Sequence, residues 1–188
     1  YAHIGTTISE KYTTSIEYKA YNSPNGAFYN AQEIGLRLAY DDSEYLGDYS
    51  VNPYVLWVWE VAGTTSPSIY YGGPDMNQHQ YVEVGLGKTF VIIASETAPV
   101  KLNVPLTIGM SFDGYYLDSN DGTQQLGYVD LGAILSMPLP NMAAAGMGNW
   151  EVYGGVDVLW LNGHYIKVDA NGDKEWGFAG KVGARITF

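Results

Sequence analysis

The chain has 188 residues, of which 46% are hydrophobic and only 15% are charged, and its formal net charge is −11. This length predicts a single domain, 1–188, and the lack of a basic surface excludes a nucleic-acid-binding protein. The absence of cysteine excludes disulfides and thiolate metal sites. The chain begins at Tyr1 rather than Met, as expected of a processed product. No apolar run approaches the roughly 18 residues of a transmembrane helix.

Apolar and polar residues alternate with a period of two along most of the chain, which predicts β-strands separated by Gly, Pro, Asn and Asp. The predicted strands are 12–21, 28–40, 50–62, 80–92, 100–113, 126–138, 150–162 and 175–188. Residues 1–11 contain HIGTTIS, which could form a further strand. The sequence therefore predicts an all-β fold. We expect a closed antiparallel up-and-down transmembrane β-barrel with eight strands, or alternatively ten.

Each predicted strand has one apolar face and one face of Gly, Tyr and charged residues. The apolar faces carry about four to six residues, close to what a tilted strand needs to cross a bilayer. We expect the opposite charges to fill a narrow lumen, as a network of Glu17, Lys19, Glu33, Arg37, Glu60, Glu83, Lys101, Asp113, Asp130, Glu151, Asp157, Lys181 and Arg185. In eight strands these charges would form a plug, whereas ten or more strands would open a pathway.

Aromatic residues on the apolar faces fall near the strand ends. If successive strands run in opposite directions, one rim carries Trp59, Phe112, Trp160 and Trp176, and the other carries Tyr40, Phe90, Trp150 and Phe188. Two such aromatic girdles are typical of the membrane–water interfaces of a β-barrel. Lys88 interrupts the apolar face of its strand, so we expect it near a rim or at a β-bulge.

The chain ends with KVGARITF, which resembles the C-terminal signature of bacterial outer-membrane β-barrel proteins. The matching residues are Lys181, Gly183, Ile186 and Phe188. The resemblance implies an integral protein of a Gram-negative outer membrane, surrounded by outer-membrane lipids and lipopolysaccharide, whose last strand is read by the barrel-assembly machinery. NPYVLWVWEV, YVEVGLGKTF and NWEVYGGVDVLWLNG are similar to strands of small porin-like families. The longer loops, 63–77, 114–124 and 163–174, would then face outward.

Two groups of residues are candidates for a catalytic site or a metal site, and each has a simpler structural interpretation. His79 and His164 flank predicted loops on strands that are not neighbours, so we expect no catalytic residue and no enzyme. Asp169, Asn171 and Asp173 offer oxygens at alternate positions, as at the start of a calcium loop. The glycine and the distal glutamate of such a loop are missing, which favours a hairpin turn without metal. We expect no cofactor.

The sequence leaves three functional hypotheses open. The first is a non-enzymatic structural, adhesive or assembly role, in which the outward loops contact a protein partner or other copies of the chain. The alternative is a small porin or channel for minor solutes. A soluble lipocalin-like ligand binder, with its apolar faces turned inward, is the second alternative.

Overall fold

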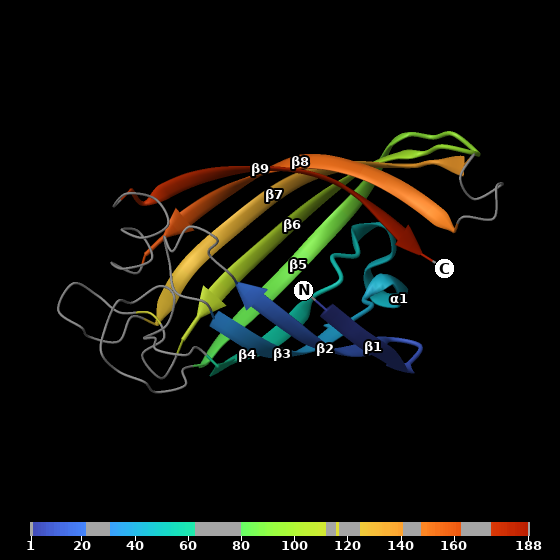
Figure 1. Ribbon diagram of the computed structural model, residues 1–188. Coiled ribbons are helices and arrows are strands. Elements are labelled where there is room, and N and C mark those ends of the chain that lie inside the picture. Colours follow the sequence, from blue (N-terminus) through green and yellow to red (C-terminus); the bar gives the residue numbers. More distant parts are fainter. Residues whose placement is uncertain are drawn as a thin grey trace.

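The computed structural model describes residues 2–21, 31–62, 80–111, 116, 125–140, 148–162 and 174–187. These residues form a single curled sheet in which each strand pairs with the next in antiparallel fashion (Figure 1). The strands are β1 (Ala2–Ser9), β2 (Tyr12–Tyr21), β3 (Ala31–Tyr40), β4 (Tyr54–Ala62), β5 (Gln80–Ile93), β6 (Val100–Met110), β7 (Leu126–Pro138), β8 (Asn149–Leu161) and β9 (Trp176–Thr187). The predicted all-β, antiparallel, up-and-down fold is confirmed.

The described residues form nine strands, whereas the sequence predicted eight or, alternatively, ten. The additional strand is β1, which pairs with β2 across a short turn at Glu10 and Lys11 and sets Ile4 opposite Ile16. Its apolar row is weak because Thr6 separates Ile4 from Ile8, so the pattern alone did not identify it firmly. The sheet is open, with β1 and β9 at its edges, and closure into a barrel is not confirmed.

Successive strands reverse direction, so the sheet has two distinct rims. The turn rim carries the connections β1–β2, β3–β4, β5–β6 and β7–β8, and the loop rim carries the other four. The three predicted outward loops lie mostly outside the described residues. The strands before these loops end at the loop rim, and the strands after them begin there. Because nine is odd, β1 and β9 run in the same direction.

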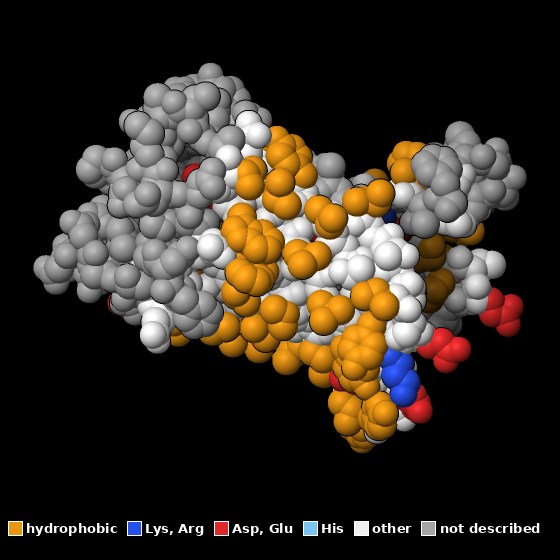
Figure 2. Space-filling view, turned by 90° about the horizontal axis from the view of Figure 1, so that it is seen from below, with side chains coloured by type: hydrophobic (Ala, Val, Ile, Leu, Met, Phe, Trp, Pro, Cys, Tyr) orange, Lys and Arg blue, Asp and Glu red, His pale blue; other side chains and the backbone are white. Residues whose placement is uncertain are grey.

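The two faces of the sheet differ sharply in composition. The concave face carries buried carboxylates, with only 2% of Glu33 and 6% of Asp157 exposed to solvent. The convex face carries the apolar rows, and 46% of Leu36 and 57% of Val156 are exposed. Figure 2 shows hydrophobic side chains gathered across one side of the molecule. This arrangement reverses the distribution that is usual in water-soluble proteins, in which charged groups seldom become fully buried.

A compact segment connects β3 to β4, where the sequence analysis predicted only a break between the strands 28–40 and 50–62. It contains a short helix, α1 (Ser43–Leu46), followed by a 3-10 turn, η1 (Gly47–Tyr49). Asp42 holds the segment together by accepting hydrogen bonds from Ser50 Oγ at 2.5 Å and from the backbone N–H groups of Val51 and Asn52 at 3.1 and 3.0 Å. In the part of the chain that the structure describes, no helix has the length and apolar character to cross a membrane.

Lys88 stays on the convex face, and no bulge accompanies it. The residue pairs in register with Val104, and the irregularity in this pair of strands falls later, between Val91 and Ile93. Its ammonium group donates a hydrogen bond to the backbone carbonyl of Asp48 in η1. The connection between β3 and β4 therefore provides the polar partner for the one lysine that interrupts an apolar row of β5.

A small apolar cluster lies on the concave side, in the half of the sheet nearer the loop rim. Its members are buried and come from β4, β5 and β8 and from one residue between β6 and β7: Leu56, Val58, Tyr81, Leu161 and Tyr116. The sequence analysis did not anticipate this cluster, because β4 is apolar on both faces and its inward residues resemble the outward ones. The interior is therefore not purely polar.

Candidate functional site

Three ion pairs between members of the predicted charge network are formed on the concave face. Lys181 Nζ lies 2.5 Å from Asp157 Oδ2, between β9 and β8. Arg185 Nη2 lies 3.0 Å from Glu151 Oε2, and Arg185 Nε donates to the same oxygen at 3.1 Å. A looser pair joins Arg37 Nη1 to Glu17 Oε1 at 4.0 Å. All six side chains belong to the predicted lumen charge network.

Other members of the predicted network lie beside a residue of the same charge, or form no ion pair with a residue of opposite charge in the described part of the chain. Glu33 and Glu60 are direct cross-strand partners, and both are buried. Tyr81 Oη donates to Glu33 Oε2 at 3.1 Å, whereas Glu60 Oε2 has no hydrogen-bond partner within the described ranges. Lys19 is the register neighbour of Glu33 on β2, yet none of the ion pairs among the described residues involves Lys19.

Tyrosine hydroxyl groups form several of the polar contacts on the concave face, where the sequence analysis expected contacts between oppositely charged side chains. Tyr128 Oη donates to Glu83 Oε1 at 2.5 Å. Tyr54 Oη lies 3.0 Å from Thr107 Oγ1, and the guanidinium carbon of Arg37 lies 3.6 Å from the centroid of the Tyr54 ring, a cation–π contact. The concave face is thus filled by phenol groups as well as by salt bridges.

Interior tyrosines lie over glycines of the neighbouring strand. In each case a Cβ built on the glycine would overlap the ring, so only glycine leaves room for it. The register pairs are Tyr54 with Gly85, Tyr128 with Gly109, and Tyr153 with Gly183. The abundance of glycine on the inward faces therefore has a packing cause that strand periodicity alone did not reveal.

The described residues of the two predicted aromatic girdles lie on the convex face. Trp160 and Trp176 are cross-strand partners at the loop rim, where β8 ends and β9 begins. The other described members are Trp59 near the loop rim, and Tyr40, Phe90 and Trp150 toward the turn rim. Two contacts were not predicted: Trp57 stacks on Trp59 with centroids 4.6 Å apart, and the Tyr12 and Tyr40 rings lie 5.0 Å apart.

Several predicted site residues lie outside the described residues. These are Asp113 of the charge network, Phe112 and Phe188 of the girdles, and the weak calcium candidates Asp169, Asn171 and Asp173, together with His79 and His164. Of the C-terminal signature, Lys181 and Gly183 share the concave face of β9, and Ile186 is opposite Trp150 of β8. Within the described ranges, no group of three or more His, Asp or Glu side chains could hold a metal ion.

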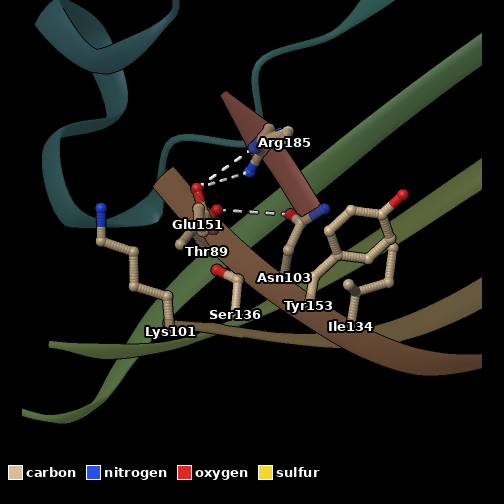
Figure 3. Close-up of a pocket in the computed structure, with 8 residues that line it drawn as sticks. All are labelled: Thr89, Lys101, Asn103, Ile134, Ser136, Glu151, Tyr153 and Arg185. Carbon is tan, nitrogen blue, oxygen red and sulfur yellow. Dashed lines mark hydrogen bonds and ion pairs between the residues drawn. The ribbon is translucent and has the colours of Figure 1, made fainter. Parts of the chain in front are cut away.

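A polar cavity of about 380 Å³ lies on the concave side near the turn rim (Figure 3). Five adjacent strands, β5 to β9, contribute its lining: Thr89, Lys101, Asn103, Ile134, Ser136, Glu151, Tyr153 and Arg185. Contacts between the lining residues order this cavity, and one of them joins the Ser136 hydroxyl to the carboxylate of Glu151. Arg185 is bonded to Glu151, and Thr89 Oγ1 donates to Asn103 Oδ1 at 3.3 Å.

The concave side therefore has two different halves. The half near the loop rim contains the apolar cluster and the tyrosine that binds Glu33, and the half near the turn rim contains the polar cavity. Within the described residues, this cavity is a candidate binding site, since it combines space with several converging polar groups. Comparison with protein-family models, with curated proteins and with solved structures finds no match to this chain.

Proposed function

We propose that the chain is an integral β-barrel protein of a bacterial outer membrane, with its convex face in contact with lipid. The observation that carries this proposal is the inverted burial of the sheet. Apolar side chains remain exposed along the convex face, while glutamates and aspartates are buried on the concave face. Such a pattern is unfavourable in water but matches a barrel whose outer surface lies in hydrocarbon.

The proposal includes closure of the sheet. An open sheet edge in hydrocarbon would leave backbone N–H and C=O groups without partners, and each such group costs several kcal/mol. The edge strands also carry some of the most exposed apolar residues, with 74% of Ile4 and 89% of Val182 accessible. Since β1 and β9 run in the same direction, the edges join either by parallel pairing or through one further strand antiparallel to both.

Within this membrane protein we favour a non-enzymatic structural, adhesive or assembly role through the connections at the loop rim. The buried cluster of Leu56, Val58 and Tyr81 supports an interior that is plugged near that rim. The alternative, a small channel, draws support from the polar cavity at the turn rim. Planar-bilayer recording separates the two: the plugged barrel gives no steady single-channel current, and a reproducible current would favour the channel.

The C-terminal residues Lys181, Gly183, Ile186 and Phe188 support delivery by the barrel-assembly machinery. Expression in a Gram-negative host followed by membrane fractionation and gel electrophoresis tests the proposal. The expected chain sediments with outer membranes, requires detergent for extraction, and migrates faster before boiling than after it. Phe188→Ser should reduce outer-membrane insertion, whereas Thr187→Ser should not. A chain that stays in the soluble fraction without detergent would refute the membrane assignment.

A further inference from the structure

We propose that the polar cavity at the turn rim binds a small oxyanion, a carboxylate or phosphate group, with Lys101 as its principal counter-charge. The site is formed by β5 to β9 alone, all in described residues, and is separate from the loop rim to which we assign the main function. The inference concerns the concave face of the sheet and does not depend on which medium covers the convex face.

The charge of the cavity lining favours an anion. Two cationic groups, Lys101 and Arg185, line it together with one carboxylate, Glu151. Arg185 Nε and Nη2 already donate hydrogen bonds to Glu151 Oε2. No ion pair among the described residues involves Lys101. In a chain with a net charge of −11, Lys101 thus forms no ion pair within 4 Å in the part that the structure describes, although its charge also acts on the carboxylate of Glu151.

The neutral groups of the lining also suit an oxyanion. Ser136 is the direct register neighbour of Lys101, and its hydroxyl, which interacts with the carboxylate of Glu151, is a donor that can rotate to a bound oxyanion. Ser136 is in turn opposite Tyr153, whose ring is held over Gly183. A cation, by contrast, would compete with Arg185 for the carboxylate of Glu151. Figure 3 shows that the lining side chains come from several strands, with Lys101 at one end of the group and Ile134 and Tyr153 at the other.

The size and position of the cavity limit the ligand. A volume of about 380 Å³ is at the lower end of the range for small-molecule sites. The lining does not include the apolar cluster near the loop rim, so the ligand is expected to enter from the turn rim. A phosphate group could reach this rim as a free solute or as part of a lipid headgroup, and both sources present the same oxygens to Lys101.

Isothermal titration calorimetry of the detergent-solubilised chain with inorganic phosphate tests the proposal, in a detergent that carries no phosphate. We expect saturable binding that Lys101→Gln weakens by about tenfold or more, because a hydrogen bond to a charged group is lost. Lys101→Arg should retain most of the affinity. Lys19→Gln is the matched control, since it removes an equal charge from the concave side outside the cavity, and should leave binding unchanged.

A second arm identifies the source of the anion. If the water-soluble headgroup glycerophosphoglycerol displaces phosphate, the cavity accepts lipid headgroups, whereas failure to displace it restricts the ligand to small free anions. Should Lys101→Gln fail to fold, Ser136→Ala replaces it, with an expected loss of a few-fold. The proposal is overturned if the folded wild-type chain binds neither phosphate nor acetate, or if Lys101→Gln and Lys19→Gln bind phosphate equally well.

Discussion

Tyr54 covers Gly85 across the β4–β5 pair, and a Cβ on the glycine would occupy the space of the phenol ring. The same relationship recurs between β6 and β7 and between β8 and β9. The phenol oxygen of Tyr54 then reaches Thr107 on β6 at 3.0 Å. Tyr54 of β4 therefore reaches across β5 to contact β6, and this contact requires a glycine at position 85 of β5.

Gly85→Ala should destabilise the folded sheet by about 1–3 kcal/mol, because the added methyl group forces Tyr54 out of its position. Urea unfolding in detergent or lipid vesicles measures the change. Gly180→Ala is the control, since a Cβ at Gly180 meets no atom within 4 Å. Equal stability of the two variants would contradict the proposed packing role of the glycine.

Leu36→Arg should strongly oppose folding into a bilayer, since Leu36 lies on the convex face at the middle of β3. A lipid-facing arginine near the bilayer centre costs about 2–4 kcal/mol. In a water-soluble sheet the same exposed position would tolerate the change within about 0.5 kcal/mol. Folding yield in vesicles is the measurement. Glu96→Arg, in the exposed turn between β5 and β6, should leave the yield unchanged.

The connection between β3 and β4 should keep its structure in moderately acidic solution. The hydrogen bond from the Ser50 hydroxyl is the main reason why the pKa of Asp42 lies below its ordinary value. The N–H groups of Asn52 and Val51 lower the pKa further, whereas burial raises it. A lowered pKa means that Asp42 stabilises the segment above its ordinary pKa, and that this contribution is lost as the pH falls through the lowered pKa.

Amide chemical shifts of Val51 and Asn52, followed by NMR from neutral to strongly acidic pH, test this expectation. Both amides should report one transition below the ordinary pKa of an aspartate. Asp42→Asn should abolish that transition and loosen the connection already at neutral pH, while Asp48→Asn should not. A transition at or above the ordinary pKa would show that the hydrogen bonds to Asp42 contribute little.

Closure of the sheet can be tested with cysteines, since the chain contains none of its own. A cysteine at Thr6 of β1 is combined in turn with one at Gly180, Val182 or Ala184 of β9, all on the convex face. Direct pairing of the edges should allow at least one disulfide, because strands in a sheet lie about 4.8 Å apart. An intervening strand should instead allow only a cross-linker about 10 Å long. Failure of both would contradict closure.

The order of the strands and the identity of the two faces were predictable from the sequence. Alternation with a period of two is a strong signal where one face is uniformly apolar, as in β3, where Ile34, Leu36 and Leu38 alternate with Glu33 and Arg37. β1 was uncertain because its row is short and contains Thr6. Closure was not predictable, because alternation describes one strand at a time and carries no information about the edges.

The candidate site was predictable only in part. Opposite charges on inward rows indicated ion pairs, and the Lys181–Asp157 and Arg185–Glu151 contacts correspond to that expectation. Spacing within a strand does not fix the register between strands, so the adjacency of Glu33 and Glu60 could not be foreseen. The cavity near Lys101 arises from five strands together, and no local sequence pattern contains it.

The most direct test of lipid contact uses the five tryptophans of the chain. Strand register assigns all of them to the convex face: Trp57, Trp59, Trp150, Trp160 and Trp176. We expect vesicles of lipids with brominated acyl chains to quench most of the tryptophan fluorescence, compared with vesicles of the unbrominated lipids. Unquenched fluorescence from a folded chain that remains dispersed in buffer without detergent would contradict the account.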